Sequence, residues 1–422
     1  MSQIDNVASD GHSEGHRKLK NAYEIALLPV GVNKIADLVN KVIPESKSSP
    51  LENMNARWRL RDAARSLANA LETPREAIVR QCWSEPTIYA AIEVAIDLGI
   101  FALLARCARP MSDAEIASAT ETNPVLLARI LKHLAATGII GETGPDEYCS
   151  TSLSVQKNIA TFSQSCNSRW FFPGIYALPT FLKETKYGDP SDTSKSAFKR
   201  GLETDRHLFE LVRQNPLLAK QFSHLMSVYR RGKPDWMDKG FYPVRERLTE
   251  GVDIKGDDVL LVDVGGNTGN DLCQFKRKWP DVPGRLILQD LPEVVDAVKG
   301  LPASIEPMAY DFFTVQPVQG ARAYYMHFIF HDWPDEICRE ILSNIIPAMT
   351  PGYSKILINE HIVPSTGAYC ETTSLDMIMM TLGSRERTED HWIKLLTSVG
   401  LKIVEIWSAQ KGVESLIECE LA

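Results

Sequence analysis

Short apolar runs alternate with helical segments along the last part of the chain, from about residue 258 onward. The runs VLLVDV, RLILQ, IEPMAY, RAYYMHFIF, SKILINE, LKIVEIW and ESLIECEL have the length and composition of strands. Segments 270–277, 291–298 and 336–349, which lie between them, have the pattern of helices. This alternation predicts a parallel sheet with helices on both faces, which is a Rossmann-like α/β fold.

A small helical module precedes this region. Residues 86–104 carry apolar side chains on one stripe and predict a helix. Ser112 is a suitable N-cap for a short second helix, and residues 123–136 predict a third helix that ends at Gly138. The segment GIIGETGPDEYCSTS then predicts a hairpin with residues 144–146 at its tip. Three helices followed by a hairpin is the order of a winged helix.

These patterns divide the chain into four segments. Residues 1–75 are an N-terminal extension, whose polar start is predicted to be disordered and whose remainder is predicted to be helical. Residues 76–160 form the winged-helix-like module. Residues 161–250 are helical and rich in large side chains, so we expect them to serve as a linker and as a lid over a substrate. Residues 251–422 form the Rossmann-like domain, where we expect the chemistry.

Charge and its distribution argue against a nucleic-acid partner. The chain has 422 residues and a formal net charge of -8, and its longest Lys/Arg run covers only residues 276–278. The third helix of the module carries only Arg129, Lys132 and His133 as basic or titratable groups. Nucleic-acid-binding surfaces are normally strongly basic. We therefore expect no nucleic acid and a dimerisation role for the module.

The cysteines and the apolar stretches predict a cytoplasmic protein. The eight cysteines are scattered without a C-x-x-C pair, which indicates reduced thiols and no metal site: Cys82, Cys107, Cys149, Cys166, Cys273, Cys338, Cys370 and Cys419. The longest apolar stretch, residues 88–104, contains Glu93 and Asp97, so we expect a core helix and no membrane span. The first 20 residues show no apolar signal-peptide core.

A glycine-rich turn, residues 263–269, follows the first predicted strand and opens a helix. Glycines allow the backbone to turn tightly and to approach a ligand that a Cβ would exclude. The dinucleotide pattern G-x-G-x-x-G is absent, because Asn267 and Asn270 stand where glycines are needed. No Gly-Lys-Ser/Thr sequence of a P-loop follows either. A pyrophosphate ligand is therefore not favoured.

Two acids at the ends of the next strands suit a nucleoside. Asp290 ends the second strand, where a carboxylate can accept hydrogen bonds from both ribose hydroxyls; the alternative is that it caps the helix that begins at Leu291. Asp311 and Phe312 follow the third strand and suit an adenine amine and ring, although a loop Asp and a core Phe remain the plainer interpretation. A nucleoside without a pyrophosphate cradle fits S-adenosylmethionine.

His331 lies at the carboxyl end of the fourth predicted strand, beside the expected ligand crevice. Methyl transfer to a hydroxyl requires removal of its proton, and a His with an ordinary pKa of about 6.5 suits this step. The imidazole must be held in one orientation by a carboxylate or carbonyl. Glu360, which ends the fifth strand, and Glu386 are the candidates.

The motifs LVDVGGNTG, LQDLPEVV, FHDWPDE, INE and RERTEDHW, in this order, resemble those of plant-type O-methyltransferases and their fungal secondary-metabolism relatives. The resemblance covers residues 75–422. It implies a class I methyltransferase sheet with an N-terminal dimerisation domain, an intertwined homodimer, a small-molecule acceptor and His331 as general base. It also implies a cofactor set, Asp263, Gly265, Gly266, Asp290, Leu291, Asp311, Phe312 and His327, and an acceptor set, Phe222, Met226, Phe328, Asp332 and Met379.

The chain departs from this family pattern at two positions. His327 stands where the family usually has a Lys or Arg that reaches the cofactor, and Asn270 replaces a common His. Some fungal members of the fold catalyse pericyclic reactions, so a pericyclase or dehydratase that keeps the cofactor is the alternative function. His331 together with both glutamates favours methylation, and the expected acceptor is an aromatic polyketide or a similar metabolite. A non-catalytic partner and a nicotinamide oxidoreductase fit these motifs less well.

Overall fold

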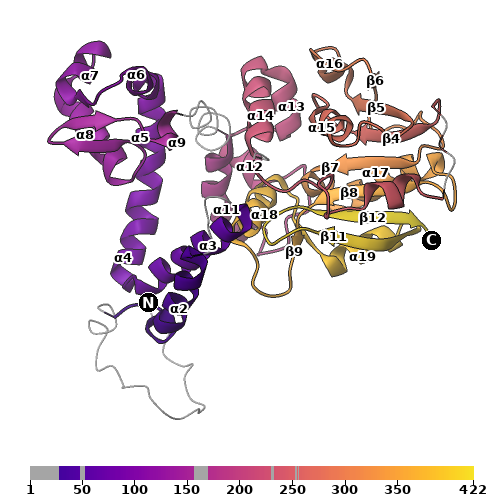
Figure 1. The fold of residues 1–422 in the computed structure, drawn as a ribbon, viewed down its shortest axis with the longest axis horizontal. Coiled ribbons are helices and arrows are strands. Elements are labelled where there is room, and N and C mark those ends of the chain that lie inside the picture. Colours follow the sequence, from indigo (N-terminus) through magenta and orange to yellow (C-terminus); the bar gives the residue numbers. More distant parts are fainter. Residues whose placement is uncertain (1–27, 48–52, 156–169, 230–231, 252–253, 255) are drawn as a thin grey trace, which may run out of the picture. The chain divides into compact units, whose positions relative to one another are not determined.

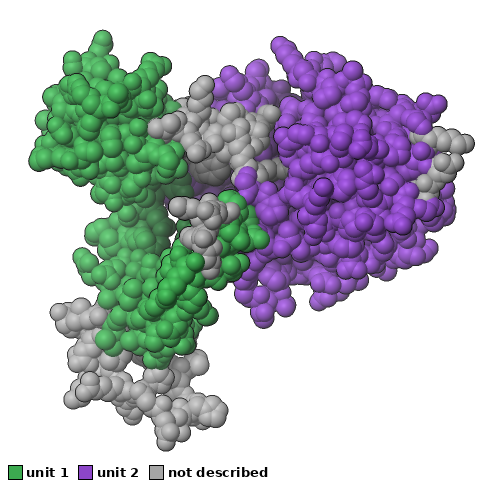
Figure 2. Space-filling view, in the orientation of Figure 1, with its two compact units in different colours: residues 1–155 green, residues 156–422 purple. Residues whose placement is uncertain are grey.

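The computed structural model describes residues 28–47, 53–155, 170–229, 232–251, 254 and 256–422. They fall into two compact units, residues 1–155 and 156–422, which Figure 2 shows in different colours. The predicted disorder at the start of the chain lies outside the described residues. The boundary expected after residue 75 falls inside a helix of the first unit, Pro74–Val79.

The first unit is built mainly from helices. Its first part contains α2 (Ile35–Ser46), α3 (Met54–Leu71), α4 (Pro74–Val79), a π-helical turn (Arg80–Ser84), α5 (Glu85–Asp97) and α6 (Ile100–Arg106). The single helix predicted for residues 86–104 is wrong, because the chain breaks at Gly99. This glycine has a left-handed backbone (φ 69°) and ends α5 in the manner of a C-cap. No single helix among the described residues is long and apolar enough to cross a membrane.

The predicted order of helices followed by a hairpin is confirmed, although α5 and α6 replace the single first helix. The elements are β1 (Met111–Ser112), α7 (Asp113–Ala119), α8 (Pro124–Ala136), β2 (Gly141–Gly144), β3 (Glu147–Cys149) and α9 (Ser152–Val155). Ser112 caps α7 in a reciprocal capping box with Glu115, and the Asn123 side chain caps α8. The strands β2 and β3 pair as the predicted antiparallel hairpin.

The second unit begins with helices that pack on a late helix of the chain. These are α11 (Phe172–Glu184), α12 (Ala197–Gly201), α13 (Leu208–Gln214) and α14 (Pro216–Tyr229), and the late helix is α18 (Cys370–Leu382). A π-helical turn (Arg245–Thr249) follows α14 in the chain. Phe198, Leu225 and Met379 belong to the shared apolar cluster that joins them. Burial of this cluster fixes α14 and α18 beside each other, so their side chains can line one space.

A seven-stranded sheet forms the centre of the second unit, in the order β11-β12-β8-β7-β4-β5-β6 (Figure 1). The strands are β4 (Val259–Val264), β5 (Arg285–Asp290), β6 (Ile305–Ala309), β7 (Ala323–His327), β8 (Lys355–Glu360), β11 (Leu401–Ser408) and β12 (Ser415–Leu421). The prediction of an all-parallel sheet is wrong in one strand. Strand β12 runs antiparallel to β8 and β11, because a short turn rather than a helical crossover connects it to β11.

Helices cover both faces of the sheet, as predicted. They are α15 (Asn270–Lys278), α16 (Pro292–Val295), α17 (Asp335–Ile345) and α19 (Glu389–Thr397). Tyr324 and Met326 of β7 lie in the apolar cluster that includes α17 and α19, whereas Tyr325 packs near Trp236 and Phe275 on the other face. This alternation is the pleat of a strand that is buried on both sides.

The fourth predicted strand is shorter than the apolar run RAYYMHFIF suggests. Strand β7 ends at His327, Phe328 has a positive φ of 52°, and residues 330–332 form a 3₁₀ turn. His331 therefore lies on a turn beyond the strand rather than at its last position. A small parallel pair that the sequence did not predict, β9 (Ile362–Val363) with β10 (Arg387–Thr388), lies next to this region in the chain's fold.

Candidate active site

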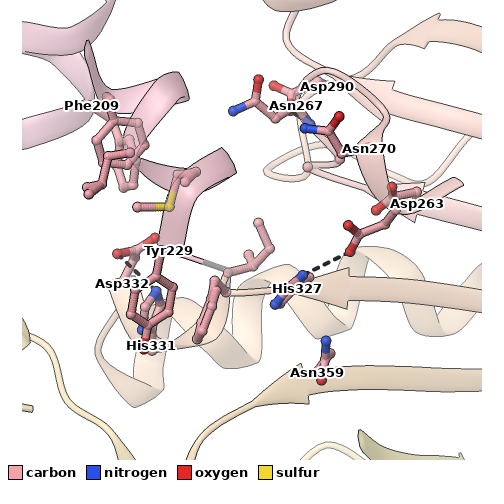
Figure 3. A pocket seen from close by; sticks show the side chains of 18 of the residues that line it. Phe209, Tyr229, Asp263, Asn267, Asn270, Asp290, His327, His331, Asp332 and Asn359 are labelled. Atoms are coloured by element: carbon pink, nitrogen blue, oxygen red, sulfur yellow. Dashed lines mark hydrogen bonds and ion pairs between the residues drawn. The ribbon is translucent and has the colours of Figure 1, made fainter. Parts of the chain in front are cut away.

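One large cavity opens at the carboxyl ends of the parallel strands, within the second unit. Its volume is ≈ 1460 Å³, which exceeds the 300–1,000 Å³ typical of a single small-molecule site. Every expected cofactor and acceptor residue lines it, as does His331, whereas Glu360 and Glu386 do not. Figure 3 shows Asn267, Asn270 and Asp290 at one end and Tyr229, His331 and Asp332 at the other.

The glycine-rich turn leaves no room for side chains. Gly265 has a φ of +75°, and a Cβ there would lie 2.5 Å from Ile329 Cδ1. A Cβ on Gly266 would lie 2.5 Å from the carboxyl carbon of Asp263. The positive φ favours glycine at position 265, and a Cβ at either position would displace neighbouring side chains, so bare backbone between β4 and α15 borders the cavity.

Asp290 is held at the end of β5 with part of its carboxylate committed. Its Oδ2 accepts a hydrogen bond from the backbone N–H of Asn267 at 2.8 Å, and its Oδ1 accepts from the N–H of Leu291 at 2.8 Å. A carboxylate has about four lone-pair sites, so two remain for a ligand. Burial raises the pKa of Asp290, which means that two donated hydroxyl hydrogens would offset a real desolvation cost.

Asp311 and Phe312 border the cavity beyond β6. Asp311 is exposed, and its Oδ1 accepts the backbone N–H of Phe313 at 3.0 Å. The rings of Phe312 and Phe313 lie 4.9 Å apart, and Phe313 meets Trp333 edge-to-face at 5.3 Å. An exposed carboxylate next to an aromatic wall suits a flat nitrogen base with an exocyclic amine.

His327 is bound to an acid, Asp271, that the sequence motifs did not indicate. Its Nδ1 lies 2.9 Å from Asp271 Oδ2, and the same oxygen accepts the Tyr325 hydroxyl at 2.8 Å. His327 Nε2 is buried without a hydrogen-bond partner in the described structure. Asp271 is in the first turn of α15, directly after the glycine-rich turn, and this position is the signal that could have identified it.

His331 lies between carboxylates. Its Nδ1 is 2.8 Å from Glu386 Oε1, and its Nε2 is 3.6 Å from Asp332 Oδ1. Burial disfavours the charged imidazole, but the carboxylates of Asp332, Glu386 and Glu360 outweigh it and raise the pKa of His331 to about 10. Burial also raises the pKa of Asp332 to about 6. The surrounding carboxylates therefore favour the imidazolium over the neutral imidazole in the free protein.

Glu360 contacts the backbone of the turn and not the imidazole. Its Oε1 accepts three consecutive N–H groups, from Ile329 at 3.1 Å, Phe330 at 2.6 Å and His331 at 3.3 Å. Burial raises the pKa of Glu360 to about 7 despite these donors and the nearby imidazolium of His331. The two glutamates thus have different tasks: Glu386 holds the imidazole, and Glu360 holds the turn that carries it.

The acceptor end of the cavity is mostly apolar and aromatic. Phe222, Met226 and Met379 line it, and the Phe328 ring stacks on His327 at 4.6 Å and on His331 at 4.8 Å. Tyr229, which the sequence motifs did not indicate, also lines this end, and its hydroxyl lies 3.1 Å from His361 Nε2. Its place on the same helix as Met226, one turn onward, was the available signal.

A neutral histidine lies farther along the same wall. His207 stacks on Trp333 at 5.1 Å and 14°, and burial lowers its pKa to about 4. Both of its ring nitrogens are buried without a hydrogen-bond partner in the described structure. No group of three or more His, Cys, Asp or Glu side chains among the described residues is arranged to hold a metal ion.

Comparison with known proteins identifies the family. The O-methyltransferase domain matches residues 244–402, and the O-methyltransferase dimerisation domain matches residues 87–156. O-methyltransferase mpaG of Penicillium brevicompactum is 37% identical over 92% of this chain and 98% of its own. Demethylsterigmatocystin 6-O-methyltransferase of Aspergillus parasiticus is 40% identical over 78% of this chain and 84% of its own.

Solved structures agree with this assignment at the level of the fold. LepI in complex with SAM is 30% identical, with a TM-score of 0.82, and covers 93% of this chain and 100% of its own. A structure described as a pericyclic reaction enzyme matches with the same values. The two domain matches and the curated relatives lead to one conclusion: the chain belongs to the O-methyltransferase family.

Proposed function

We propose that this O-methyltransferase transfers a methyl group from S-adenosylmethionine to a phenolic or enolic hydroxyl of a small secondary metabolite. The observation that carries the proposal is the position of His331, held by Glu386, at the opposite end of a cavity whose other end fits a nucleoside. When bound, S-adenosylmethionine supplies an electrophilic methyl group on a positively charged sulfur. The acceptor we propose is an aromatic polyketide, and the similarity to demethylsterigmatocystin 6-O-methyltransferase supports a secondary-metabolite acceptor.

The cofactor would be held by residues along the carboxyl ends of β4 to β7. Asp290 would accept the ribose hydroxyls, with Leu291 beside it, and Asp311 and Phe312 would contact the adenine. Gly265 and Gly266 would admit the amino-acid tail close to Asp263. The fit rests on the two free lone-pair sites of Asp290 and on the space that only glycine leaves in the turn.

His327 belongs to the same proposed cofactor set, although it is not the cation that the family usually has there. Asp271 binds the Nδ1 atom of His327, so only the buried Nε2 atom can contact a ligand. A small shift of the surrounding side chains would expose Nε2 to the cavity. Asp271 and His327 would therefore act as one unit beside the amino-acid tail of the cofactor.

His331 would act as the general base through Nε2, the nitrogen on the cavity side. The neutral imidazole takes the proton from the acceptor hydroxyl, and Glu386 stabilises the imidazolium that results. His331 is protonated in the free protein at neutral pH, so it must first release a proton. A neighbouring positive charge on the bound cofactor would favour that release, since like charges lower the pKa of a cationic acid.

The acceptor would bind among Phe222, Met226, Phe328 and Met379, with Asp332 beside the reacting oxygen. These side chains exclude water and orient a flat ring, and positioning of this kind supplies much of the rate. The pericyclase or dehydratase alternative is not favoured. The curated O-methyltransferases are more similar in sequence than the pericyclic reaction enzyme, and His331 keeps its carboxylate partners.

The experiment measures binding and transfer separately. Calorimetry with S-adenosylhomocysteine should give micromolar binding to the wild type, and Asp290→Ala should weaken it by at least about 10-fold, because each lost charge-assisted hydrogen bond contributes about 1.5–3 kcal/mol. Labelled S-adenosylmethionine should then methylate members of a phenolic polyketide panel. His331→Ala should bind the cofactor as the wild type does but should lose transfer by roughly 10²-fold or more.

Each alternative outcome has a distinct meaning. Absence of binding to the wild type would refute the cofactor assignment. Binding without transfer to any acceptor would refute methylation of this substrate class. Transfer that survives in His331→Ala would remove the base from the mechanism while leaving the cofactor site in place.

The same proposal includes a homodimer. The dimerisation domain match covers residues 87–156, and the first unit exposes large apolar side chains that a monomer would leave in water, among them Trp83 at 67% and Val125 at 73% exposure. Light scattering on the full chain should give twice the mass of 47.1 kDa. A monomer at micromolar concentration would contradict it.

A further inference from the structure

We propose that Arg387 is a positioning residue that holds the turn carrying His331, so that the imidazole and Glu386 meet in a fixed geometry. The inference rests on the proposed role of His331 as general base. Arg387 lies within the motif RERTEDHW, but it does not line the cavity and belongs to neither the expected cofactor set nor the expected acceptor set.

The Arg387 guanidinium is committed to the backbone of this turn. Its Nη1 donates to the Phe330 carbonyl at 2.7 Å, and its Nη2 donates to the Trp333 carbonyl at 2.8 Å. These two carbonyls flank His331 in the chain. Arg387 is 1% exposed, so the two hydrogen bonds are shielded from water and from competing partners.

A carboxylate fixes the guanidinium itself. Asp335, in the first turn of α17, accepts from Arg387 Nε at 2.9 Å and from Nη2 at 2.8 Å. The planar fork of an arginine loses little freedom for each bond once one edge is fixed in this way. A lysine has one nitrogen and cannot reproduce both the carboxylate contact and the two carbonyl contacts.

The other side of the turn is held from a different strand. Glu360, the last residue of β8, accepts the N–H groups of residues 329–331, while Arg387 takes the carbonyls of residues 330 and 333. The Ser384 hydroxyl donates to the carbonyl of His331. A short 3₁₀ turn leaves backbone groups without partners, and here charged side chains satisfy them on both sides.

The two sides are also joined to each other. Strand β10 pairs with β9 in register, Arg387 with Ile362, and Ile362 follows Glu360 by two residues. Arg387 directly follows Glu386, the carboxylate that binds the imidazole. The paired strands β9 and β10 therefore fix the positions of Glu386, Arg387 and Glu360 relative to one another. A shift of the Arg387 side chain would move the turn that carries His331 relative to Glu386.

A purely structural role is the competing explanation. Arg387 lies over the Trp392 ring at 5.3 Å and within 3.3 Å of Cys338 Sγ, so its loss would also weaken packing near α17 and α19. Arg322 provides a matched control for this effect. It is a buried arginine, 7% exposed, that donates to the carbonyls of Leu248, Tyr353 and Arg247, and it precedes β7 at the end of the strand away from His327.

The test compares Arg387→Lys with Arg322→Lys in the full chain. We expect Arg387→Lys to lower kcat by roughly 10²-fold, because misplacement of a catalytic group by about 1 Å has this effect. Its dissociation constant for S-adenosylhomocysteine should stay within about 2-fold of the wild type, since Arg387 does not border the cavity. Arg322→Lys should lower the melting temperature and leave kcat within about 3-fold.

A titration of the histidine ring signals by NMR gives a readout that needs no methyl transfer. The His331 signal, assigned with His331→Gln, should titrate at lower pH in Arg387→Lys than in the wild type, since the imidazole loses its close contact with Glu386. In Arg322→Lys it should titrate as in the wild type. If Arg387→Lys does not fold, Asp335→Asn is the second variant, because the Asp335 side chain is 39% exposed and its replacement disturbs packing little. This variant keeps Arg387 but removes the carboxylate that fixes its guanidinium. It should show the same changes in kcat and in the His331 titration, at smaller size.

An Arg387→Lys protein with normal kcat and an unchanged His331 titration would overturn the proposal, as would equal effects of the two arginine variants on kcat. A wild type that transfers no methyl group would instead refute the proposed function. The NMR comparison still tests Arg387 in that case, so the two failures can be told apart.

Discussion

At the scale of single residues, the chemistry depends on which carboxylate meets which group of the base. Glu386 lies 2.8 Å from the imidazole Nδ1, whereas Glu360 binds only the backbone of the turn. The resemblance treats both glutamates as flanking partners of His331. The structure separates them, because one oxygen of Glu360 already accepts three N–H groups.

This separation predicts different results for two conservative variants. Glu386→Gln removes the charge that stabilises imidazolium, so the pKa of His331 falls from about 10 and kcat drops by roughly 10²-fold. In a pH profile of kcat/KM, the rising limb should move to lower pH. Glu360→Gln keeps an oxygen that can accept the three N–H groups. Both its kcat and the pH of its rising limb should therefore change much less than in Glu386→Gln. Equal limb shifts in the two variants would contradict the division of roles.

At the level of secondary structure, the sequence predicts the strands whose apolar runs stop where the strand stops. The runs that form β4, β5 and β8 end at Val264, Asp290 and Glu360, and this made the acids at the strand ends recognisable. The run RAYYMHFIF continues apolar beyond β7, so the break at Phe328 was hidden. The Phe328 ring stacks on His331, and the Phe330 ring packs against Trp392. Both contacts depend on the tertiary fold, so the local sequence pattern does not reveal that the strand has ended.

Long-range pairing accounts for the other differences. Strand β12 inserts antiparallel between β8 and β11, and a strand with apolar residues on both faces reads the same in either direction. Strand β10 has only two residues, and its partner strand β9 lies 25 residues earlier in the sequence. No local sequence pattern therefore indicates this pairing. Asp271 was missed for a related reason: a first-turn acid usually serves a helix N-terminus, and its contact with His327 arises only when β7 lies beside β4.

At the scale of the whole molecule, the charged cluster around His331 affects the stability of the fold as well as its chemistry. The imidazole pKa is about 10 in the folded protein and about 6.5 in an unfolded chain. The folded protein thus binds more protons than the unfolded chain between these values. This contribution is complete below pH 6.5 and is lost as the pH rises toward 10. Burial raises the pKa of Asp332 to about 6 and that of Glu360 to about 7. The stability that these two protonated carboxyl groups contribute is therefore lost at lower pH than the contribution of His331.

We therefore expect the free energy of unfolding of the ligand-free protein to fall by about 2 kcal/mol between pH 7 and 8.5, close to the value for one extra bound proton. Urea titrations at several pH values measure this. The double variant Asp332→Asn/Glu386→Gln should lose most of the decline, because burial then disfavours the charged imidazole and only Glu360 remains to oppose it. The thiols and tyrosines whose pKa burial raises are the same in both proteins, so the difference between the two curves reports on His331 and its carboxylate partners. A flat wild-type curve would mean that the imidazole is already neutral, and that the base needs no ligand to release its proton.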